Sequence, residues 1–168
     1  MYDIQPLGCS NFDHRYNIDG LITYSSFPKR ERSFSYVQLF RNGIIEAVNS
    51  ELLWSDSGQK YIPITAIESK LIEFIPNYLK VFKKFNIEPP IFLFVTLIDV
   101  KDYTIPRDGS WRFKIYPIDR ELVLIPEIII ENLKFEPSQL LKPVFDSIWN
   151  ACGIRRSLNY DKDGKWIA

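Results

Sequence analysis

The segment 36–48 constrains the fold more than any other part of this chain. Two arms of strand-forming residues flank a short polar connection that ends in Asn42-Gly43, the strongest short-range signal for a β-hairpin. Glu46 interrupts the apolar return strand, and we expect it either to face solvent or to be buried and paired with Arg41 or Arg120. The segment therefore predicts an antiparallel strand pair in the first half of the chain.

The composition indicates a globular protein that can bury a core. The chain has 168 residues, of which 46% are hydrophobic and 15% aromatic, a length typical of one domain. Lysine and arginine number 21, as do aspartate and glutamate, so net charge favours neither nucleic acid nor an anionic membrane as a partner. We expect a cytoplasmic protein without a signal sequence or membrane span, in which Cys9 and Cys152 stay reduced.

Two helices are predicted by periodicity. In the first, Thr65 and Glu68 have the spacing of a capping box, and an apolar stripe continues to Phe82. Pro76 lies within this stripe and predicts either a kink or a division into two helices. The second helix is predicted over 138–152, with Gly153 as its terminator and Pro143 tolerated in its first turn.

The remaining patterns predict strands. The run 91–98 is apolar on both faces apart from Thr96, which predicts a strand at the centre of a sheet, buried on both sides. Three further segments are typical of strands: 21–24, 111–116 and 121–125. We expect residues 52–54 to extend the sheet before a turn over 55–58. The pattern of 127–133 fits either a strand or a short helix.

The order of strands, helix, strands, helix favours an α+β fold with a mostly antiparallel sheet and two main helices. A profilin-like or GAF-like sandwich is one compatible arrangement. The predicted organisation is an extended N-terminal arm over 1–18, a single α+β domain over 19–153, and a polar C-terminal tail over 154–168 that Trp166 anchors.

Motifs that would carry chemistry are weak. The segment 159–164 matches the first half of a calcium loop, but the carboxylate ligand at the twelfth position of such a loop would fall beyond Ala168, and a polar turn explains the segment better. One histidine, His14, and two scattered cysteines do not supply a standard zinc site or a nucleophile with its base. We therefore predict no metal site, and the sequence identifies no cofactor.

Polar residues near the predicted element ends are candidates for binding a ligand. Their convergence on one pocket would define a site, and a metal-dependent nuclease could use the carboxylates among them. The candidate ligand-binding residues are Arg41, Glu46, Asp119, Arg120, Asp146, Asn150 and Asp161. For direct binding of single-stranded nucleic acid, the candidates are three basic groups, of which the last lies near two aromatic rings. These groups are 29–32, Lys80 with Lys83 and Lys84, and Arg155 with Arg156 beside Tyr160 and Trp166.

Five segments resemble the C-terminal region of bacterial proteins that carry an N-terminal Schlafen-type AlbA domain and are described as DNA-binding or ATP-binding. These segments are 36–48, 88–92, 117–121, 145–153 and 159–166. The functional descriptions of that family belong to the AlbA part, which this sequence lacks, so the resemblance assigns no site residue. It implies that the chain is either a fragment or a free-standing relative.

These observations favour a non-catalytic accessory module. Such a module would sense a ligand or contact a protein, either a separate partner or its own upstream domain, beside a nucleic-acid-linked effector, and it could self-associate. A metal-dependent nuclease or hydrolase is the second hypothesis, and direct binding of single-stranded nucleic acid is the third.

Overall fold

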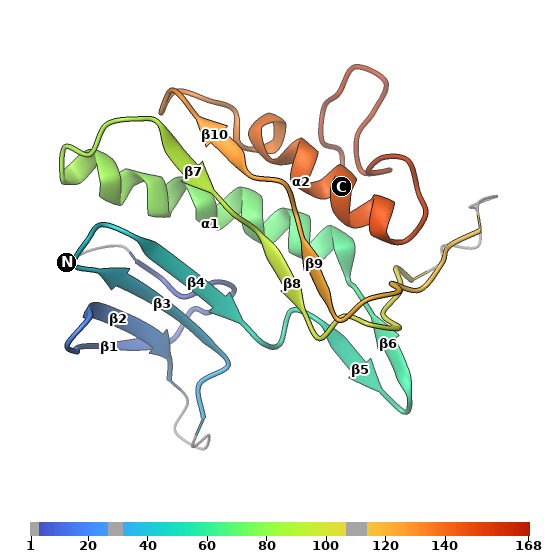
Figure 1. Ribbon diagram of the computed structural model, residues 1–168, viewed down its shortest axis with the longest axis horizontal. Coiled ribbons are helices and arrows are strands. Elements are labelled where there is room, and N and C mark those ends of the chain that lie inside the picture. The colour runs from blue at the N-terminus through green and yellow to red at the C-terminus, as the bar shows by residue number, and fades with distance from the viewer. Residues whose placement is uncertain (1–3, 27–31, 107–113) are drawn as a thin grey trace. The chain divides into compact units, whose positions relative to one another are not determined.

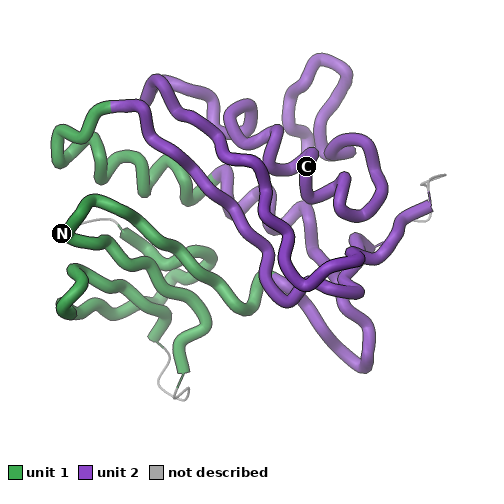
Figure 2. The backbone as a smooth tube through the Cα atoms, in the orientation of Figure 1, with its two compact units in different colours: residues 1–52, 73–88 green, residues 53–72, 89–168 purple. Residues whose placement is uncertain are grey.

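The computed structural model describes residues 4–26, 32–106 and 114–168, and it has the predicted α+β architecture with two helices and antiparallel sheets (Figure 1). The chain divides into two compact units (Figure 2). Unit 1 comprises residues 1–52 and 73–88, and unit 2 comprises 53–72 and 89–168. The single domain expected over 19–153 stays a prediction. Neither helix in the described part of the chain is long and apolar enough to cross a bilayer.

A four-stranded antiparallel meander forms the sheet of unit 1. Its strands, in spatial and chain order, are β1 Phe12–Tyr16, β2 Gly20–Ser25, β3 Ser35–Phe40 and β4 Ile45–Asn49. The predicted arm over 1–18 is wrong for residues 12–16, which pair with β2 from Phe12 opposite Ser25 to Tyr16 opposite Leu21. Every side chain of β1 is exposed, so this edge strand has no buried face that would give it an apolar period.

The β3–β4 hairpin confirms the strongest prediction from the sequence. Leu39 lies opposite Ile45, and the backbone N–H of Phe40 donates to the carbonyl of Ile44 at 2.8 Å. Gly43 has a φ of 88°, a left-handed conformation that glycine adopts without a steric penalty. The position of Gly43 therefore explains why the chain reverses here.

Residues 4–9 contact both the sheet and the helical part of unit 1. The carbonyl of Ile4 accepts from Thr23 Oγ1 of β2 at 2.6 Å, and the carbonyl of Gln5 accepts from Tyr78 Oη at 2.9 Å. Ile4 is fully buried, as is Val37 of β3. This stretch of the predicted arm turns at Leu7–Gly8 and belongs to the core of unit 1.

Helix α1 Ile64–Lys84 contains residues of both units, with the boundary between Ile72 and Glu73. The helix continues through Pro76, which excludes a division into two helices, and the alternative of a kink at Pro76 stays a prediction. A left-handed Asn86 follows the helix, and the N–H of Ile87 donates to the carbonyl of Phe82 at 2.9 Å. Lys83 and Lys84 place positive charge in the last turn, where it suits the helix dipole.

Three antiparallel strand pairs lie in unit 2. β5 Trp54–Asp56 pairs with β6 Gln59–Tyr61 as a separate hairpin, so the expected extension of the first sheet by residues 52–54 is wrong. β7 Ile91–Leu93 pairs with β10 Ile128–Ile130, and β8 Thr96–Ile98 pairs with β9 Leu122–Leu124. Residues 127–133 thus contain a strand rather than a helix. The expected strand 111–116 is absent over 114–116, and its other residues lie outside the described ranges.

Helix α2 Pro137–Ala151 agrees with the second predicted helix. Glu136 caps its N-terminus, since the side chain accepts from the N–H of Gln139, and Pro137 occupies the first turn. Gly153, with a φ of 83°, follows the C-terminus, where the N–H of Ile154 donates to the carbonyl of Trp149 at 3.0 Å. Pro143 lies in the interior of the helix rather than in its first turn.

Candidate interaction surface and buried polar cluster

A fully buried carboxylate, Glu68 of α1, lies at the centre of a polar cluster in unit 2. Its Oε1 accepts from Trp149 Nε1 at 3.0 Å and from Ser157 Oγ at 2.8 Å. Its Oε2 accepts from Asn159 Nδ2 at 2.8 Å and from Trp166 Nε1 at 2.9 Å. Four donors from α2 and the C-terminal segment thus surround one carboxylate, which compensates for the water that it loses on burial.

The cluster shows that the predicted capping box is wrong. α1 begins at Ile64, and Thr65 Oγ1 accepts from Asn159 Nδ2 at 3.0 Å. The Glu68 side chain turns to donors 81 to 98 residues away in the chain. A capping box would leave these indole and amide groups, which are wholly or partly buried, without an acceptor, and a buried donor without an acceptor costs about 1–3 kcal/mol.

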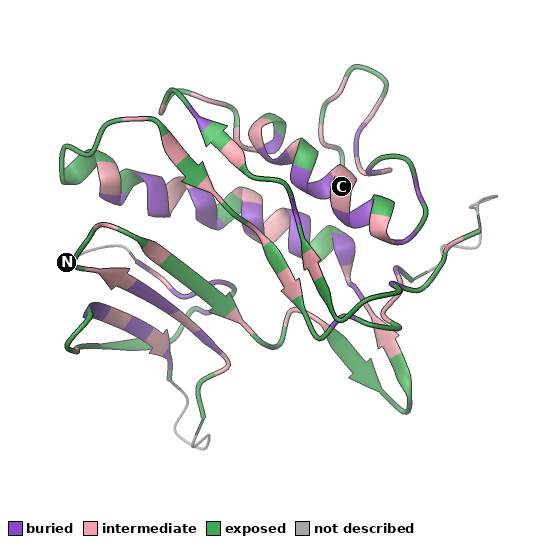
Figure 3. Ribbon diagram, viewed as in Figure 1, coloured by how far each residue is buried: buried purple, intermediate pink, exposed green. Residues whose placement is uncertain are grey.

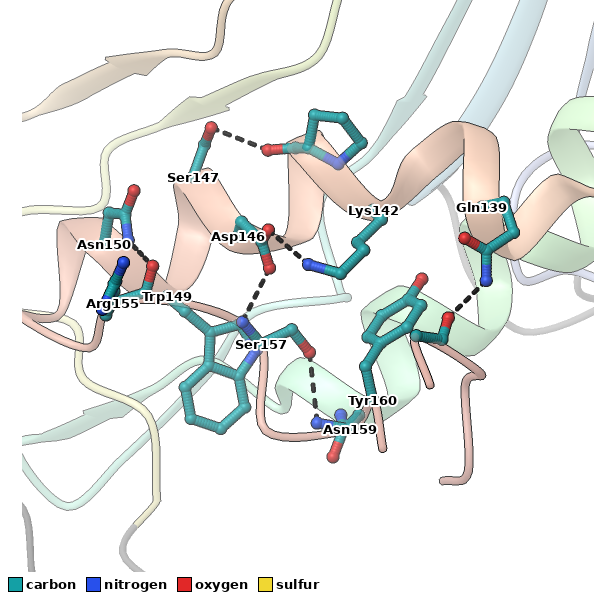
Figure 4. A network of polar contacts seen from close by, with 12 residues as sticks. Gln139, Lys142, Asp146, Ser147, Trp149, Asn150, Arg155, Ser157, Asn159 and Tyr160 are labelled. Carbon is teal, nitrogen blue, oxygen red and sulfur yellow. Dashed lines mark hydrogen bonds and ion pairs between the residues drawn. The ribbon is translucent and has the colours of Figure 1, made fainter. Parts of the chain in front are cut away.

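The C-terminal segment 154–168, predicted as a polar tail with Trp166 as its anchor, is packed against α2, and Ile154, Ser157 and Tyr160 are buried (Figure 4). Asp146 accepts from Lys142 Nζ at 2.6 Å and from the backbone N–H of Ser157 at 2.8 Å. Tyr160 is buried and donates its hydroxyl to the carbonyl of Ser138 at 2.5 Å. Burial, with a smaller contribution from Glu68, raises the pKa of Tyr160. Trp166 anchors the segment through its bond to Glu68, as the sequence predicts.

This arrangement suits a structural role better than a catalytic one. Both oxygens of Glu68 are occupied by two donors each, and the side chain has no exposed surface. A general base needs a free lone pair within reach of a substrate. Glu68 therefore serves to bind helix α2 and the C-terminal segment to the first turns of α1.

Two of the seven predicted ligand-binding residues belong to unit 1. Arg41 Nε donates to the carbonyl of Ile18 at 3.0 Å, next to the hairpin turn. Glu46 is exposed and accepts from Tyr36 Oη at 2.7 Å, which selects the solvent-facing alternative over the buried pair with Arg41 or Arg120. This hydrogen bond is the main cause that raises the pKa of Tyr36 to about 12.

The other five belong to unit 2, where each makes local contacts. Asp119 and Arg120 bond to each other at 2.7 Å on the surface, and the hydrogen bond from Arg120 lowers the pKa of Asp119. Asp146 and Asn150 lie one turn apart on α2, and Asn150 Nδ2 donates to the carbonyls of Ile154 and Arg155. Asp161 accepts from the N–H groups of Asp163 and Lys165 within a polar turn. Ligand binding by these seven residues stays a prediction.

Groups that could act as nucleophiles or metal ligands are dispersed in the described ranges. No three histidine, cysteine, aspartate or glutamate side chains in that part of the chain gather in a way that could hold a metal ion. Cys9 and Cys152 are both buried and free, and burial raises the pKa of the Cys152 thiol. His14 is exposed on β1, and its backbone N–H donates to Asp13 Oδ1 at 2.7 Å.

The most unusual surface of unit 2 is apolar. β7 and β8 follow each other along residues 91–98 and pair with β10 and β9, and the N–H of Ile125 donates to the carbonyl of Val95 to join the two ladders. One extra residue over 126–127 forms a bulge, which keeps the outward side chains of both strands on one face. We call this two-stranded structure, residues 91–98 with 122–130, the ribbon.

One face of the ribbon consists of large apolar side chains that are 45% to 70% exposed. Exposed and less exposed residues alternate strictly along 91–98, as the colours of β7 and β8 show (Figure 3). Phe92 lies opposite Ile129, and Ile98 lies opposite Leu122, so these pairs share a face. The face, named the ribbon face below, comprises Phe92, Phe94, Ile98, Leu122, Leu124 and Ile129.

The ribbon corrects the prediction of a central strand buried on both sides. The alternate residues of the ribbon are less exposed, and two of them, Ile125 and Ile130, are buried in the core of unit 2. The prediction was right that both faces are apolar, but only one of them is covered. The signal that could have indicated this surface is a second apolar stretch at 122–130, which Pro126 and Glu127 interrupt and which is long enough to pair with the first.

Comparisons with known proteins add no relative. No family model matches the chain, and neither the curated proteins nor the solved structures contain a match. The resemblance to the C-terminal region of Schlafen-type AlbA proteins and the profilin-like or GAF-like arrangement therefore stay predictions.

Proposed function

We propose that this chain is a non-catalytic accessory module that contacts another protein through the ribbon face. The observation that carries the proposal is the row of large apolar side chains on one side of the ribbon, from Phe92 to Ile98 and from Leu122 to Ile129. A strand that is apolar on both faces is usually covered on both faces. A partner that seats on the ribbon would supply the missing cover.

The size of the ribbon face supports this role. The exposed fractions of the two phenylalanines and the four leucine or isoleucine residues add up to about three and a half fully exposed residues, and an area near the lower end of the 150–250 Å² of aromatic side chains gives roughly 650 Å² of surface. The largest apolar patch on a typical monomer covers about 300–600 Å² and is often functional. An exposed apolar patch larger than this range favours association with another molecule, because association removes apolar surface from water.

The polar candidates give less support to the two alternative functions. A metal-dependent nuclease needs convergent carboxylates, whereas Asp119, Asp146 and Asp161 each accept hydrogen bonds from their own neighbourhood. Binding of single strands needs exposed aromatic rings beside basic groups. Tyr160 is buried and the Trp166 indole is bonded to Glu68, so the rings near Arg155 and Arg156 are engaged inside unit 2.

The resemblance to Schlafen-type AlbA proteins supports the setting of this module. On that basis we place it in the bacterial cytoplasm, beside a nucleic-acid-linked effector. The module itself would contribute contact rather than chemistry.

Photo-crosslinking in living cells tests the proposal. We expect p-benzoylphenylalanine at position 94 to give a discrete protein adduct on irradiation, because Phe94 projects from the middle of the ribbon face. The matched control carries the same amino acid at position 16, where Tyr16 is also an exposed aromatic residue, on β1 of unit 1. Adducts at both positions, or at neither, would contradict a specific contact through the ribbon.

A further inference from the structure

We propose that the occupant of the ribbon face is the ribbon face of a second copy of this chain, in a two-fold symmetric dimer. This inference rests on the proposed function and names its partner. In such a dimer the same patch is used twice, so each copy covers the apolar surface of the other. The outward rows of Phe94 and Leu124, which are the most exposed members of the face, would lie nearest the symmetry axis.

The area of the ribbon face is sufficient for a stable dimer. Two faces of roughly 650 Å² would bury about 1,300 Å² in total, and specific protein interfaces bury about 1,200–2,000 Å². Contacts from the rim would add to this value. A single copy therefore provides what a complete interface requires, without any further surface.

The composition of the face favours a second copy over a different partner. The face contains six large apolar side chains, and Thr96 is the one polar residue among the outward positions of 92–98. The interfaces of homodimers are more apolar than those of transient complexes. The chain also has equal numbers of acidic and basic residues, so two copies carry no net charge that would keep them apart.

The geometry of the ribbon permits direct packing of face on face. Two antiparallel sheets stack about 10 Å apart when their side chains interdigitate, as in a β-sandwich. The inward face of the ribbon already packs on the core through residues such as Ile125 and Ile130. A second ribbon on the outward face would give each strand the two covered sides that its sequence demands.

Sedimentation and light scattering of the full chain across micromolar concentrations test the dimer. We expect a particle of twice 19.8 kDa. Phe94→Glu and Leu124→Glu should each weaken dimerisation at least tenfold, because each places a charge in the middle of an apolar interface. Both side chains are exposed, so both variants should keep the circular dichroism spectrum of the parent protein.

The matched control is Tyr16→Glu, which places the same charge on an exposed aromatic position of β1. This variant should remain dimeric. A symmetric contact has a further signature: Leu124→Cys should form a disulfide between copies under mild oxidation, whereas Tyr16→Cys should not. A dimer that persists in both glutamate variants of the ribbon would overturn the inference, since the contact would then lie elsewhere.

The crosslink at position 94 separates this inference from the proposed function. An adduct with twice the mass of the chain supports both. An adduct with a different protein, from a chain that is monomeric in solution, would overturn the second copy as occupant and leave the interaction module standing. A monomeric chain that gives no discrete adduct would overturn both.

Discussion

Glu68 shows how one residue can determine the packing of a whole unit. A buried carboxylate is unfavourable unless hydrogen bonds replace its water, and four donors do so here. Two of these donors are indoles, and the other two are the side chains of Ser157 and Asn159. Each of them is itself withdrawn from water, wholly or in part, and needs the acceptor as much as Glu68 needs donors.

Replacement of Glu68 should therefore be costly. We expect Glu68→Ala to lower the free energy of unfolding by about 3–5 kcal/mol, because it leaves a cavity and four donors without an acceptor. Glu68→Gln keeps the volume but directs an amide N–H₂ at two of those donors, and should cost roughly 2 kcal/mol. Urea unfolding followed by tryptophan fluorescence measures both, since Trp149 and Trp166 belong to the cluster.

The control for these variants is Glu131→Gln, which changes an exposed carboxylate of the same unit. It should change the free energy of unfolding by less than about 0.5 kcal/mol. If Glu68→Gln were as mild as Glu131→Gln, the carboxylate would not be the acceptor on which the cluster depends.

At the scale of elements, local signals predicted what local interactions decide. The hairpin at Asn42-Gly43 and the turn that follows α2 at Gly153 each require a left-handed backbone conformation. Glycine adopts this conformation readily, so its presence in the sequence indicates both turns. The spacing of apolar residues predicted α1 and α2, because that spacing is also a local property of the sequence. The prediction of a capping box was wrong because Glu68 accepts hydrogen bonds from donors that are far away in the sequence. The strand β1 was not predicted because both of its faces are exposed.

Glu136 at the start of α2 provides a test that depends on pH. Burial favours its neutral acid, but the hydrogen bonds from Ser138 and Gln139 outweigh burial, so the pKa of Glu136 lies below its ordinary value. A lowered pKa contributes stability above the unfolded value of about 4.3, and this contribution is lost as the pH falls through the folded pKa. Glu136→Ala should cost about 1 kcal/mol near neutral pH and less in acid.

Urea midpoints measured between about pH 7 and about pH 3.5 would show this convergence of parent and variant. Glu136→Gln serves as the control, because its amide oxygen can still accept from the N–H of Gln139 but does not titrate. Glu136→Gln should lower the free energy of unfolding less than Glu136→Ala does, and the contribution of this position to stability should no longer depend on pH. A difference between parent protein and Glu136→Ala that stays constant with pH would argue against a charged cap.

At the scale of the molecule, the C-terminal segment is part of the core of unit 2. A chain that stops after Gly153 would lose three of the four donors to Glu68, from Ser157, Asn159 and Trp166. We expect this truncation to abolish the cooperative unfolding transition of unit 2 and to shift the emission of Trp149 toward that of a solvated indole. A chain that stops after Trp166 keeps all four donors and should unfold like the parent protein.

The candidate surface was harder to foresee than the fold. Seven polar residues suggested a ligand site, yet a polar residue near an element end has the same appearance whether it binds a ligand or a neighbouring N–H, as Asp161 does. The ribbon face was visible as two apolar runs, but a sequence does not show which side of an apolar strand is covered. That depends on the surroundings of the ribbon, including any partner.

The bonds of Glu68 also bear on the order in which the protein can form during synthesis. The carboxylate leaves the ribosome before its partners, since Trp149 comes 81 residues later and Trp166 comes 98 residues later. Until these donors are present, burial of the Glu68 carboxylate is unfavourable, so the carboxylate stays hydrated. Consolidation of unit 2 is thus a long-range event that has to wait for Trp166, and the apolar stretches 91–98 and 122–130 are synthesised before it.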